Sequence, residues 1–326
     1  MSVRVHLYRE YSSEINNTFL SKLDQAIIIS SGDTIPTPAD YEILVYPTPT
    51  KAWLDASPYL HAIVIPWAGI PAKTRKVMAD YSHITVHNLH HNSFNTAEFG
   101  LTLLLAAAKF LIPMDQALRN NDWTPRYQSS QAILLRGKKV LILGCGEIGQ
   151  AFGAYCLGLG MKVMATKKHT DQFSSDLDIQ LFPPDKLHSL LPKADVLFIA
   201  LPLTQETEDL IGRIEIQLMP KGSILINIGR GPIVNQFALY DALVNGHLRS
   251  AGSDVWYNYP KTEAMRKATP PAEVPFGDLD NFVLSPHRGG IVEDVETQRA
   301  QALAALLNAA VRNLPIPNKV DLKMGY

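Results

Sequence analysis

The chain has little cysteine, no long apolar run and no excess of charge of either sign. Its two cysteines, Cys145 and Cys156, form no CxxC pair, so neither a disulfide framework nor a thiolate metal site is expected. Lysine plus arginine number 30 and aspartate plus glutamate 31, which gives no indication of a nucleic-acid or anionic-membrane surface. Leu101 to Leu111 is too short to span a bilayer, and Val3 to Tyr8 is too short and polar for a signal sequence. We therefore expect a soluble, cytoplasmic protein.

A length of 326 residues allows two domains, each with its own core. In the first hundred residues, short apolar runs alternate with more polar, helix-like stretches, which is typical of βα units and a parallel sheet. Asn95 to Phe110 has apolar residues at helical spacing and predicts one long helix, which Ile112-Pro113 ends or kinks. The strands expected before this helix are Val3–Tyr8, Ala26–Ile29, Ile43–Tyr46, Ala62–Ile65 and Ile84–Val86.

Residues 138–168 combine two apolar runs with a glycine turn and an Ala-rich helix between them. Val140–Leu143 leads into Gly144-Cys145-Gly146-Glu147-Ile148-Gly149, and Val163–Ala165 follows the helix. In this order the first glycine allows a tight turn, the second lets the backbone approach a pyrophosphate, and the third allows close helix–strand packing. The helix N-terminus supplies unpaired N–H groups to the anion. The segment therefore predicts a dinucleotide site.

The sequence after Gly137 predicts a doubly wound sheet, because six apolar runs alternate with helical stretches. In such sheets, ligands bind at the carboxyl ends of the strands. Arg230 follows the fourth run and His287 follows the last, so both lie at the edge that carries the glycine turn. Together they favour a functional site over a surface arginine and a capped histidine. The six runs are Val140–Leu143, Lys162–Ala165, Val196–Ala200, Ser223–Ile228, Arg249–Val255 and Phe282–Leu284.

An ordered set of motifs from Gly137 to Gly290 resembles the D-isomer-specific 2-hydroxyacid dehydrogenases. A weaker match, NTAEFGLTLLLAAAK (95–109), is similar to the helix that joins the two domains in that family. The resemblance implies two doubly wound α/β domains, with a Rossmann domain inserted into a smaller flavodoxin-like substrate domain. It places the substrate domain at residues 1–98 and 291–326 and the dinucleotide-binding domain at residues 99–290. The motifs are GCGEIG (144–149), LPLTQETEDLIG (201–212), MPKGSILINIGRGPIVN (219–235), AGSDVW (251–256) and SPHRGG (285–290).

The resemblance also assigns roles residue by residue. Arg230 is similar to the arginine that holds the substrate carboxylate and carbonyl oxygen, a task that suits a planar guanidinium. His287 resembles the histidine that protonates the carbonyl oxygen as hydride arrives, and Trp67-Ala68-Gly69 resembles the segment that offers backbone N–H groups to the substrate. Asp254 is similar to the residue at the nicotinamide end. The implied cofactor-binding residues are Gly144, Gly146, Glu147, Ile148, Gly149, Lys167, Lys168, Leu201, Pro202, Thr207, Ile228, Gly229, Asp254 and Gly289.

One departure from the family concerns the partner of the histidine. Most members carry a glutamate just before a proline, whereas this chain has Tyr259 before Pro260. A phenol can form a hydrogen bond with an imidazole, but it is neutral at pH 7 and does not hold an imidazolium as a carboxylate does. Related formate dehydrogenases have an uncharged partner there, and their hydride transfer needs no proton. Glu263 and Glu273, on the following loop, are alternative partners.

The second departure concerns the cofactor. NAD-preferring members end the second strand of the unit with an acidic residue, whereas this chain continues with Lys167, Lys168 and His169. These side chains would attract a 2′-phosphate, and we expect nothing there to repel it. A solvated pair of surface lysines is the alternative interpretation. The sequence therefore predicts that NADP(H) is preferred and that NAD(H) is possible.

Three functions are consistent with these residues. The first is an NADP-dependent oxidoreductase acting on a small 2-oxo or 2-hydroxy acid, such as glyoxylate or hydroxypyruvate. The alternatives are a dehydrogenase of a formate-like anion and a non-catalytic dinucleotide-binding protein, although a sensor would need neither Arg230 nor His287. Adjacent His90 and His91 lack metal-site spacing, so no metal is expected, and they are expected to line the cleft. A homodimer follows from the resemblance, with Asn95 to Phe110 as its candidate surface.

Overall fold

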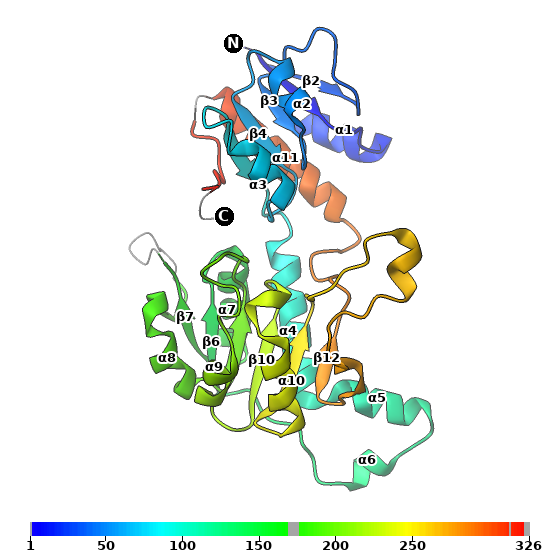
Figure 1. Ribbon diagram of the computed structural model, residues 1–326, viewed down its shortest axis with the longest axis vertical. Coiled ribbons are helices and arrows are strands. Elements are labelled where there is room, and N and C mark those ends of the chain that lie inside the picture. Colours follow the sequence, from blue (N-terminus) through cyan, green and yellow to red (C-terminus); the bar gives the residue numbers. More distant parts are fainter. Residues whose placement is uncertain (1, 169–175, 313, 323–326) are drawn as a thin grey trace. The chain divides into compact units, whose positions relative to one another are not determined.

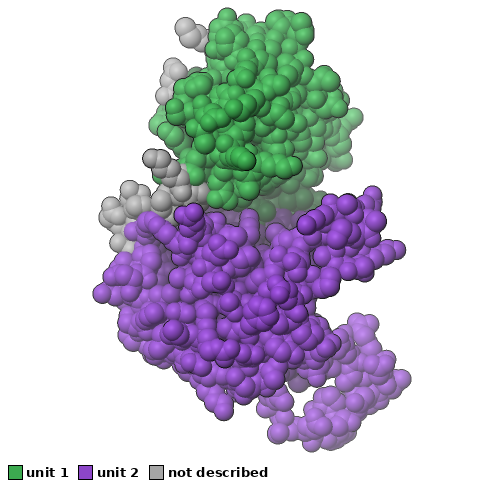
Figure 2. Space-filling view, viewed as in Figure 1, with its two compact units in different colours: residues 1–92, 292–326 green, residues 93–291 purple. Residues whose placement is uncertain are grey.

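The computed structural model describes residues 2–168, 176–312 and 314–322, and they divide into two compact units. Unit 1 comprises residues 1–92 and 292–326, and unit 2 comprises residues 93–291 (Figure 2). The expected boundary between residues 98 and 99 falls inside helix α4 (Ser93–Lys109), all of which belongs to unit 2. The reason is that α4 packs on α7 (Glu147–Gly158) and on the strands of unit 2. His169, expected beside the cofactor, lies outside the described residues.

In the described part of unit 1, a five-stranded parallel sheet has the order β2-β1-β3-β4-β5, which is the flavodoxin-like order. Successive residues of each strand point to opposite faces. Val5, Val45 and Val64 therefore pack on one face with α1 and α11, while Leu44 and Ile63 pack on the other with α2 and α3. The elements are β1 (Val3–Leu7), α1 (Ser13–Lys22), β2 (Ile27–Ser31), β3 (Ile43–Val45), α2 (Lys51–Ala56), β4 (Ala62–Ile65), α3 (Ala72–Met78), β5 (Thr85–Asn88) and α11 (Val295–Val311).

The described part of unit 2 contains a seven-stranded parallel sheet of order β12-β11-β10-β9-β6-β7-β8, the doubly wound arrangement of a Rossmann domain (Figure 1). The six expected strands are all present. The strands are β6 (Lys139–Leu143), β7 (Lys162–Thr166), β8 (Ile179–Phe182), β9 (Val196–Ile199), β10 (Ser223–Asn227), β11 (Leu248–Ser253) and β12 (Phe282–Leu284).

Helices cover both faces of this sheet. Val140 and Ile142 pack with α4 and α7, whereas Leu141 and Leu143 alternate to the face of α8, α9 and α10. The other helices of unit 2, with the short 3-10 turns labelled η, are α5 (Leu111–Arg119), α6 (Thr124–Tyr127), η1 (Pro184–Lys186), α8 (Leu187–Leu190), η2 (Leu191–Lys193), α9 (Arg213–Leu218), η3 (Gly231–Ile233), α10 (Gln236–Val244), η4 (Glu263–Lys267) and η5 (Phe276–Asp278).

Helix α4 packs its apolar side into the core of unit 2, and its expected role as a surface for dimerisation stays a prediction. Ala97, Leu103 and Leu104 are buried in the core, and an added Cβ at Gly100 would lie 2.7 Å from the ring of Phe198. The chain then turns at Phe110, whose φ is 52°, and α5 leaves at 69° to α4. Among the described residues, no single helix is long and apolar enough to cross a membrane. Helices α4 and α5 meet that length and composition only when they are taken together, and this pair is bent.

Candidate active site

The chemistry-bearing residues of unit 2 follow the carboxyl ends of adjacent parallel strands. The glycine turn follows β6, Lys167 and Lys168 follow β7, and the segment 201–209 follows β9. Arg230 follows β10, and Asp254 comes directly after β11. The loop that carries His287 follows β12. Because the strands are parallel and neighbouring, all these segments meet at one edge of the sheet.

The glycine turn has the shape that a pyrophosphate requires. Gly144 has a φ of 94°, and an added Cβ at Gly149 would lie 2.1 Å from the carbonyl oxygen of Gly144, so both positions need glycine. An added Cβ at Gly146 would instead point into open space at the N-terminus of α7. An anion can therefore approach the unpaired N–H groups of the helix from this side. The geometry fits a dinucleotide, with Gly146, Glu147 and Ile148 at the opening.

The segment after β9 is held by the hydroxyl of Thr207. This hydroxyl donates to the carbonyl oxygen of Pro202 at 2.7 Å and accepts the N–H of Thr204 at 2.8 Å. An added Cβ at Gly229 would lie 2.6 Å from the carbonyl oxygen of Leu201, so the β9 and β10 segments are in close contact. The residues of these two segments that were expected at the cofactor therefore lie together: Leu201, Pro202, Thr207 and Gly229. Ile228 is buried behind them.

Arg230 lies between two glycines that the surrounding backbone requires. An added Cβ at Gly231 would lie 2.4 Å from the backbone of Trp256, which explains the sequence Gly-Arg-Gly together with the contact at Gly229. The amide of Asn227 donates to the carbonyl oxygen of Arg230 at 2.9 Å and fixes the turn. Nη1 of Arg230 donates to the carbonyl oxygen of Gly229 at 2.6 Å. Burial lowers the pKa of this guanidinium from its usual range.

Tyr259 and His287 are hydrogen-bonded to each other, with 3.0 Å between Tyr259 Oη and His287 Nδ1. The backbone N–H of Trp256 donates to the same phenol oxygen at 3.1 Å. Glu263, an alternative partner in the sequence, pairs with Arg266, and Glu273 bonds Gln236. The phenol, and neither of these carboxylates, is therefore the group that contacts the imidazole.

The electrostatic surroundings of His287 disfavour its charged form. Desolvation lowers the pKa of His287, and the nearby charge of Arg230 lowers it further, while Asp254 acts in the opposite direction. Desolvation raises the pKa of Tyr259. Both groups are therefore neutral near pH 7 in the described structure, and His287 binds a proton less readily than a free imidazole.

Asp254 anchors the loop that carries His287. Its Oδ1 accepts the hydroxyl of Ser285 at 2.6 Å and the N–H of Arg288 at 2.8 Å, and its Oδ2 accepts the N–H of Gly289 at 2.8 Å. An added Cβ at Gly289 would lie 2.8 Å from Asp254 Oδ2, so this contact also needs glycine. The buried carboxylate thus holds the loop on both sides of His287, whose own φ is 61°. The expected contact of Asp254 with a nicotinamide stays a prediction.

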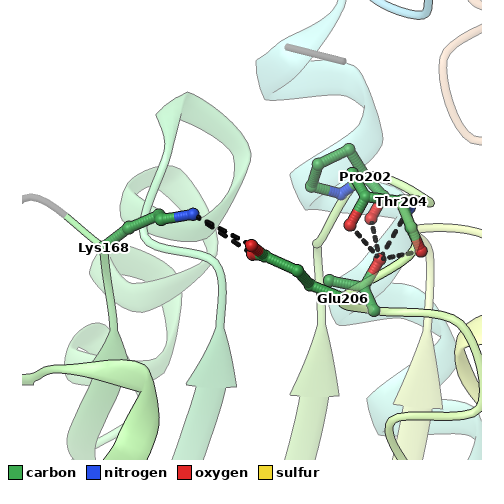
Figure 3. Close-up of polar contacts among 5 residues, drawn as sticks. Lys168, Pro202, Thr204 and Glu206 are labelled. Carbon is green, nitrogen blue, oxygen red and sulfur yellow. Dashed lines mark hydrogen bonds and ion pairs between the residues drawn. The ribbon is translucent and has the colours of Figure 1, made fainter. Parts of the chain in front are cut away.

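The two lysines after β7 have different partners. Lys167 Nζ donates to the carbonyl oxygen of Cys145 at 3.0 Å, whereas Lys168 Nζ forms an ion pair with Glu206 Oε2 at 3.1 Å (Figure 3). Glu206 lies in the segment after β9 and was not among the expected residues. The expectation that nothing near the lysines would repel a phosphate is therefore wrong, because the structure brings a carboxylate to Lys168.

The expected substrate residues of unit 1 lie in the segment after β4. The side chain of Asn88, the last residue of β5, donates to the carbonyl oxygen of Ala68 at 2.7 Å and holds this segment, which also contains Trp67 and Gly69. His91 follows β5, and its two ring nitrogens are buried without a hydrogen-bond partner. Burial, with a smaller effect of Arg299, lowers the pKa of His91 to about 4.

Comparison with known proteins gives consistent results. Residues 101–289 match the model described as D-isomer specific 2-hydroxyacid dehydrogenase, NAD binding domain. A glyoxylate reductase of Korarchaeum cryptofilum is 31% identical over 229 residues, which are 69% of this chain and 65% of that protein. A D-3-phosphoglycerate dehydrogenase of Methanocaldococcus jannaschii is 28% identical over 287 residues, 87% of this chain and 52% of that one. The matched part thus spans between about half and two thirds of these relatives.

The fold also matches a solved structure over its full length. A D-isomer specific 2-hydroxyacid dehydrogenase from Xanthobacter autotrophicus Py2, in complex with NADPH and MES, superimposes with a TM-score of 0.80 and 21% sequence identity. The match covers 100% of both chains. At this identity the similarity establishes that both domains have the same fold.

Proposed function

Because this chain belongs to the D-isomer-specific 2-hydroxyacid dehydrogenase family, we propose that it reduces a small 2-oxo acid with NADP(H) as the preferred cofactor. Glyoxylate and hydroxypyruvate are the expected kind of substrate. The observation that carries the proposal is the hydrogen-bonded pair of Tyr259 and His287 beside Arg230, at the edge of the sheet that carries the glycine turn. A non-catalytic nucleotide-binding protein would need neither the arginine nor the imidazole.

In this mechanism Arg230 binds and orients the acid. Its planar guanidinium offers parallel N–H donors to the carboxylate and the carbonyl oxygen, and its burial strengthens these bonds by excluding water. The hydride for the carbonyl carbon would come from NADPH when this cofactor is bound at the glycine turn. His287, in its protonated form, donates a proton to the carbonyl oxygen, so that a 2-hydroxy acid and neutral imidazole result. Oxidation of the hydroxy acid follows the same steps in reverse.

Tyr259 can support both protonation states of His287, but unequally. When the imidazole is neutral, the phenol can donate its proton to Nδ1 while its oxygen accepts the N–H of Trp256. When the imidazole is protonated, Nδ1–H must donate, and the phenol oxygen then accepts two N–H groups without a compensating negative charge. A carboxylate in the same place would stabilise the imidazolium. With Tyr259 as its partner, protonated His287 is therefore expected to have a lower pKa than it would have beside a carboxylate.

The preference for NADP(H) is supported by the residues after β7. Lys167 stands where NAD-preferring members carry an acid, and the ammonium of Lys168, the next residue, is suited to a 2′-phosphate. Lys167, turned toward Cys145, adds positive charge at the glycine turn. The relative from Xanthobacter autotrophicus Py2 was solved with NADPH.

A homodimer is part of the proposal, with α5 and α6 as a second candidate surface beside α4. These two helices stand apart from the sheet of unit 2 in Figure 1, and neither has a buried residue. Their apolar side chains include Leu118, which is 50% exposed, and Trp123, the residue before α6, which is 60% exposed. A molar mass of one chain in light scattering would contradict this assignment.

The test is a panel of 2-oxo acids with both cofactors. NADPH oxidation on addition of glyoxylate or hydroxypyruvate, lost in His287→Ala, is the expected result, and D-3-phosphoglycerate with NADP belongs in the panel as well. A second candidate, oxidation of a formate-like anion, is favoured by Tyr259 alone, since that reaction needs no proton donor. NADP reduction by formate that survives His287→Ala would establish it instead. Similar kcat/KM values with NADH and NADPH would contradict the cofactor preference.

A further inference from the structure

Lys168 and Glu206 form an ion pair between two segments on either side of the glycine turn. In the sheet, β6 lies between β7 and β9, so the residues after β7 and β9 flank the turn that follows β6. Lys168 Nζ lies 3.1 Å from Glu206 Oε2 and 3.5 Å from Oε1. Figure 3 shows the two side chains extended toward each other from the segments that follow β7 and β9. The pair therefore lies where the adenosine end of a dinucleotide on this turn would bind.

The segment that carries Glu206 is held in place by its neighbours. The hydroxyl of Thr207 bonds to both Pro202 and Thr204, and the N–H of Glu208 donates to the carbonyl oxygen of Thr204 at 3.0 Å. Glu206 thus projects from a hydrogen-bonded turn, which places its carboxylate beside Lys168.

The ion pair is open to exchange with solvent ions. The Lys168 side chain is 39% exposed and that of Glu206 is 72% exposed, and pairs with this exposure contribute little to stability. A phosphate monoester carries more negative charge than a carboxylate and has three acceptor oxygens. A 2′-phosphate can therefore replace Glu206 on Lys168, but it must displace the carboxylate to do so.

We propose that Glu206 is a specificity-determining residue that lowers the affinity for NADP(H) by competing with the 2′-phosphate for Lys168. NAD(H), which has a hydroxyl in place of the phosphate, binds with the ion pair closed and is unaffected by this competition. The proposal rests on the proposed function in one respect, that the glycine turn binds a nicotinamide dinucleotide. The ion pair of Lys168 and Glu206 would then reduce, without abolishing, the preference for NADP(H) over NAD(H).

The test compares Glu206→Gln with the wild type in cofactor binding, without turnover. Dissociation constants for NADPH and NADH come from the fluorescence of the reduced nicotinamide, and those for adenosine 2′,5′-bisphosphate and 5′-AMP from calorimetry. Without the carboxylate of Glu206, the phosphate no longer competes for Lys168 at this exposed site. We therefore expect NADPH and the bisphosphate to bind about three- to fivefold more tightly. NADH and 5′-AMP should change less than twofold. The matched control is Glu208→Gln, which removes an exposed carboxylate from the same turn and should change none of the four values.

Lys168→Met establishes whether Glu206 acts through the lysine. This change should weaken NADPH at least about tenfold, because the phosphate loses a charge-assisted partner. In the Lys168→Met background, Glu206→Gln should bring no further tightening. Equal tightening of NADPH in both backgrounds, equal tightening of NADPH and NADH, or no change in the single variant would each overturn the proposal.

Failure of the proposed function would give a different result. A wild type that binds NADH more tightly than NADPH contradicts the proposed cofactor preference. The role of Glu206 is still decided by the ratio of the dissociation constants of Glu206→Gln and the wild type for the bisphosphate. Absence of turnover with every acid contradicts the enzymatic proposal and leaves these binding ratios unchanged.

Discussion

Tyr259 Oη lies 3.0 Å from His287 Nδ1, so the group that forms a hydrogen bond with the imidazole is a phenol and not a carboxylate. Reduction requires protonated His287, and a pKa lowered by desolvation means that the rate falls as pH rises through a value below that of free histidine. Below that pKa the proton is present and the rate is at its plateau.

Replacement of Tyr259 by Glu should extend this plateau to higher pH. A carboxylate on Nδ1 stabilises the imidazolium, and we expect the pKa in the pH profile of kcat/KM for NADPH-dependent reduction to rise by about 1 unit or more. Tyr259→Phe removes the hydrogen bond without adding charge and should not raise that pKa. An unchanged profile in the glutamate variant would show that the phenol does not control His287.

Arg230→Lys should reduce activity despite the retained charge. A lysine offers a point charge in place of two parallel donors, so kcat/KM for the oxo acid should fall by about 10²- to 10³-fold, or roughly 3–4 kcal/mol. NADPH affinity should remain within about twofold because the lost contacts are with the acid. A variant with near wild-type kcat/KM would contradict the role of the guanidinium.

Gly149→Ala and Gly146→Ala should separate folding from cofactor binding. The added methyl group at residue 149 would lie 2.1 Å from the carbonyl oxygen of Gly144, so the melting temperature should fall by several degrees. At residue 146 the methyl group meets nothing in the protein and points toward the cofactor side, so NADPH should bind at least about tenfold more weakly with stability unchanged. Gly158→Ala, also in open space, is the control for an added methyl group in α7.

Asp254→Asn should destabilise the loop that carries His287. An amide keeps one acceptor oxygen, whereas the carboxylate accepts three hydrogen bonds from Ser285, Arg288 and Gly289. The loss should lower the free energy of unfolding by about 2–3 kcal/mol, as measured by urea denaturation. Asp278→Asn, an exposed acid of the same unit, should leave it unchanged. Equal stability of Asp254→Asn and wild type would contradict the anchoring role.

Much of the fold could be predicted because each strand is a short apolar run next to a glycine or polar segment. The strand that was missed, β8, has four residues, none of them fully buried, and lies at the edge of the sheet. The long helix was expected to end or kink at Ile112-Pro113, but the chain turns earlier, at Phe110. Pro113 lies in the first turn of α5, where proline is tolerated because its missing N–H would have no partner within the helix.

The candidate site was less predictable where its partners are distant in the sequence. The resemblance made Tyr259 a candidate partner of His287, with Glu263 and Glu273 as alternatives, and the structure decides between them. Glu206 was missed since it is 38 residues from Lys168 and meets it only through the order of the strands. The three donors to Asp254 could not be predicted from the sequence either, because two of them are backbone N–H groups, which nearly every residue supplies.

The backbone of His287, with its φ of 61°, separates two properties of the catalytic group. Its position is set by main-chain hydrogen bonds to Asp254, while its ring nitrogen bonds the side chain at position 259, which adds to the effects of burial and of Arg230 on its basicity. A substitution at 259 can therefore retune the proton donor without moving it. Natural selection could change the working pH of this centre, or remove its acid function, through one codon, and the rest of the loop would keep its conformation.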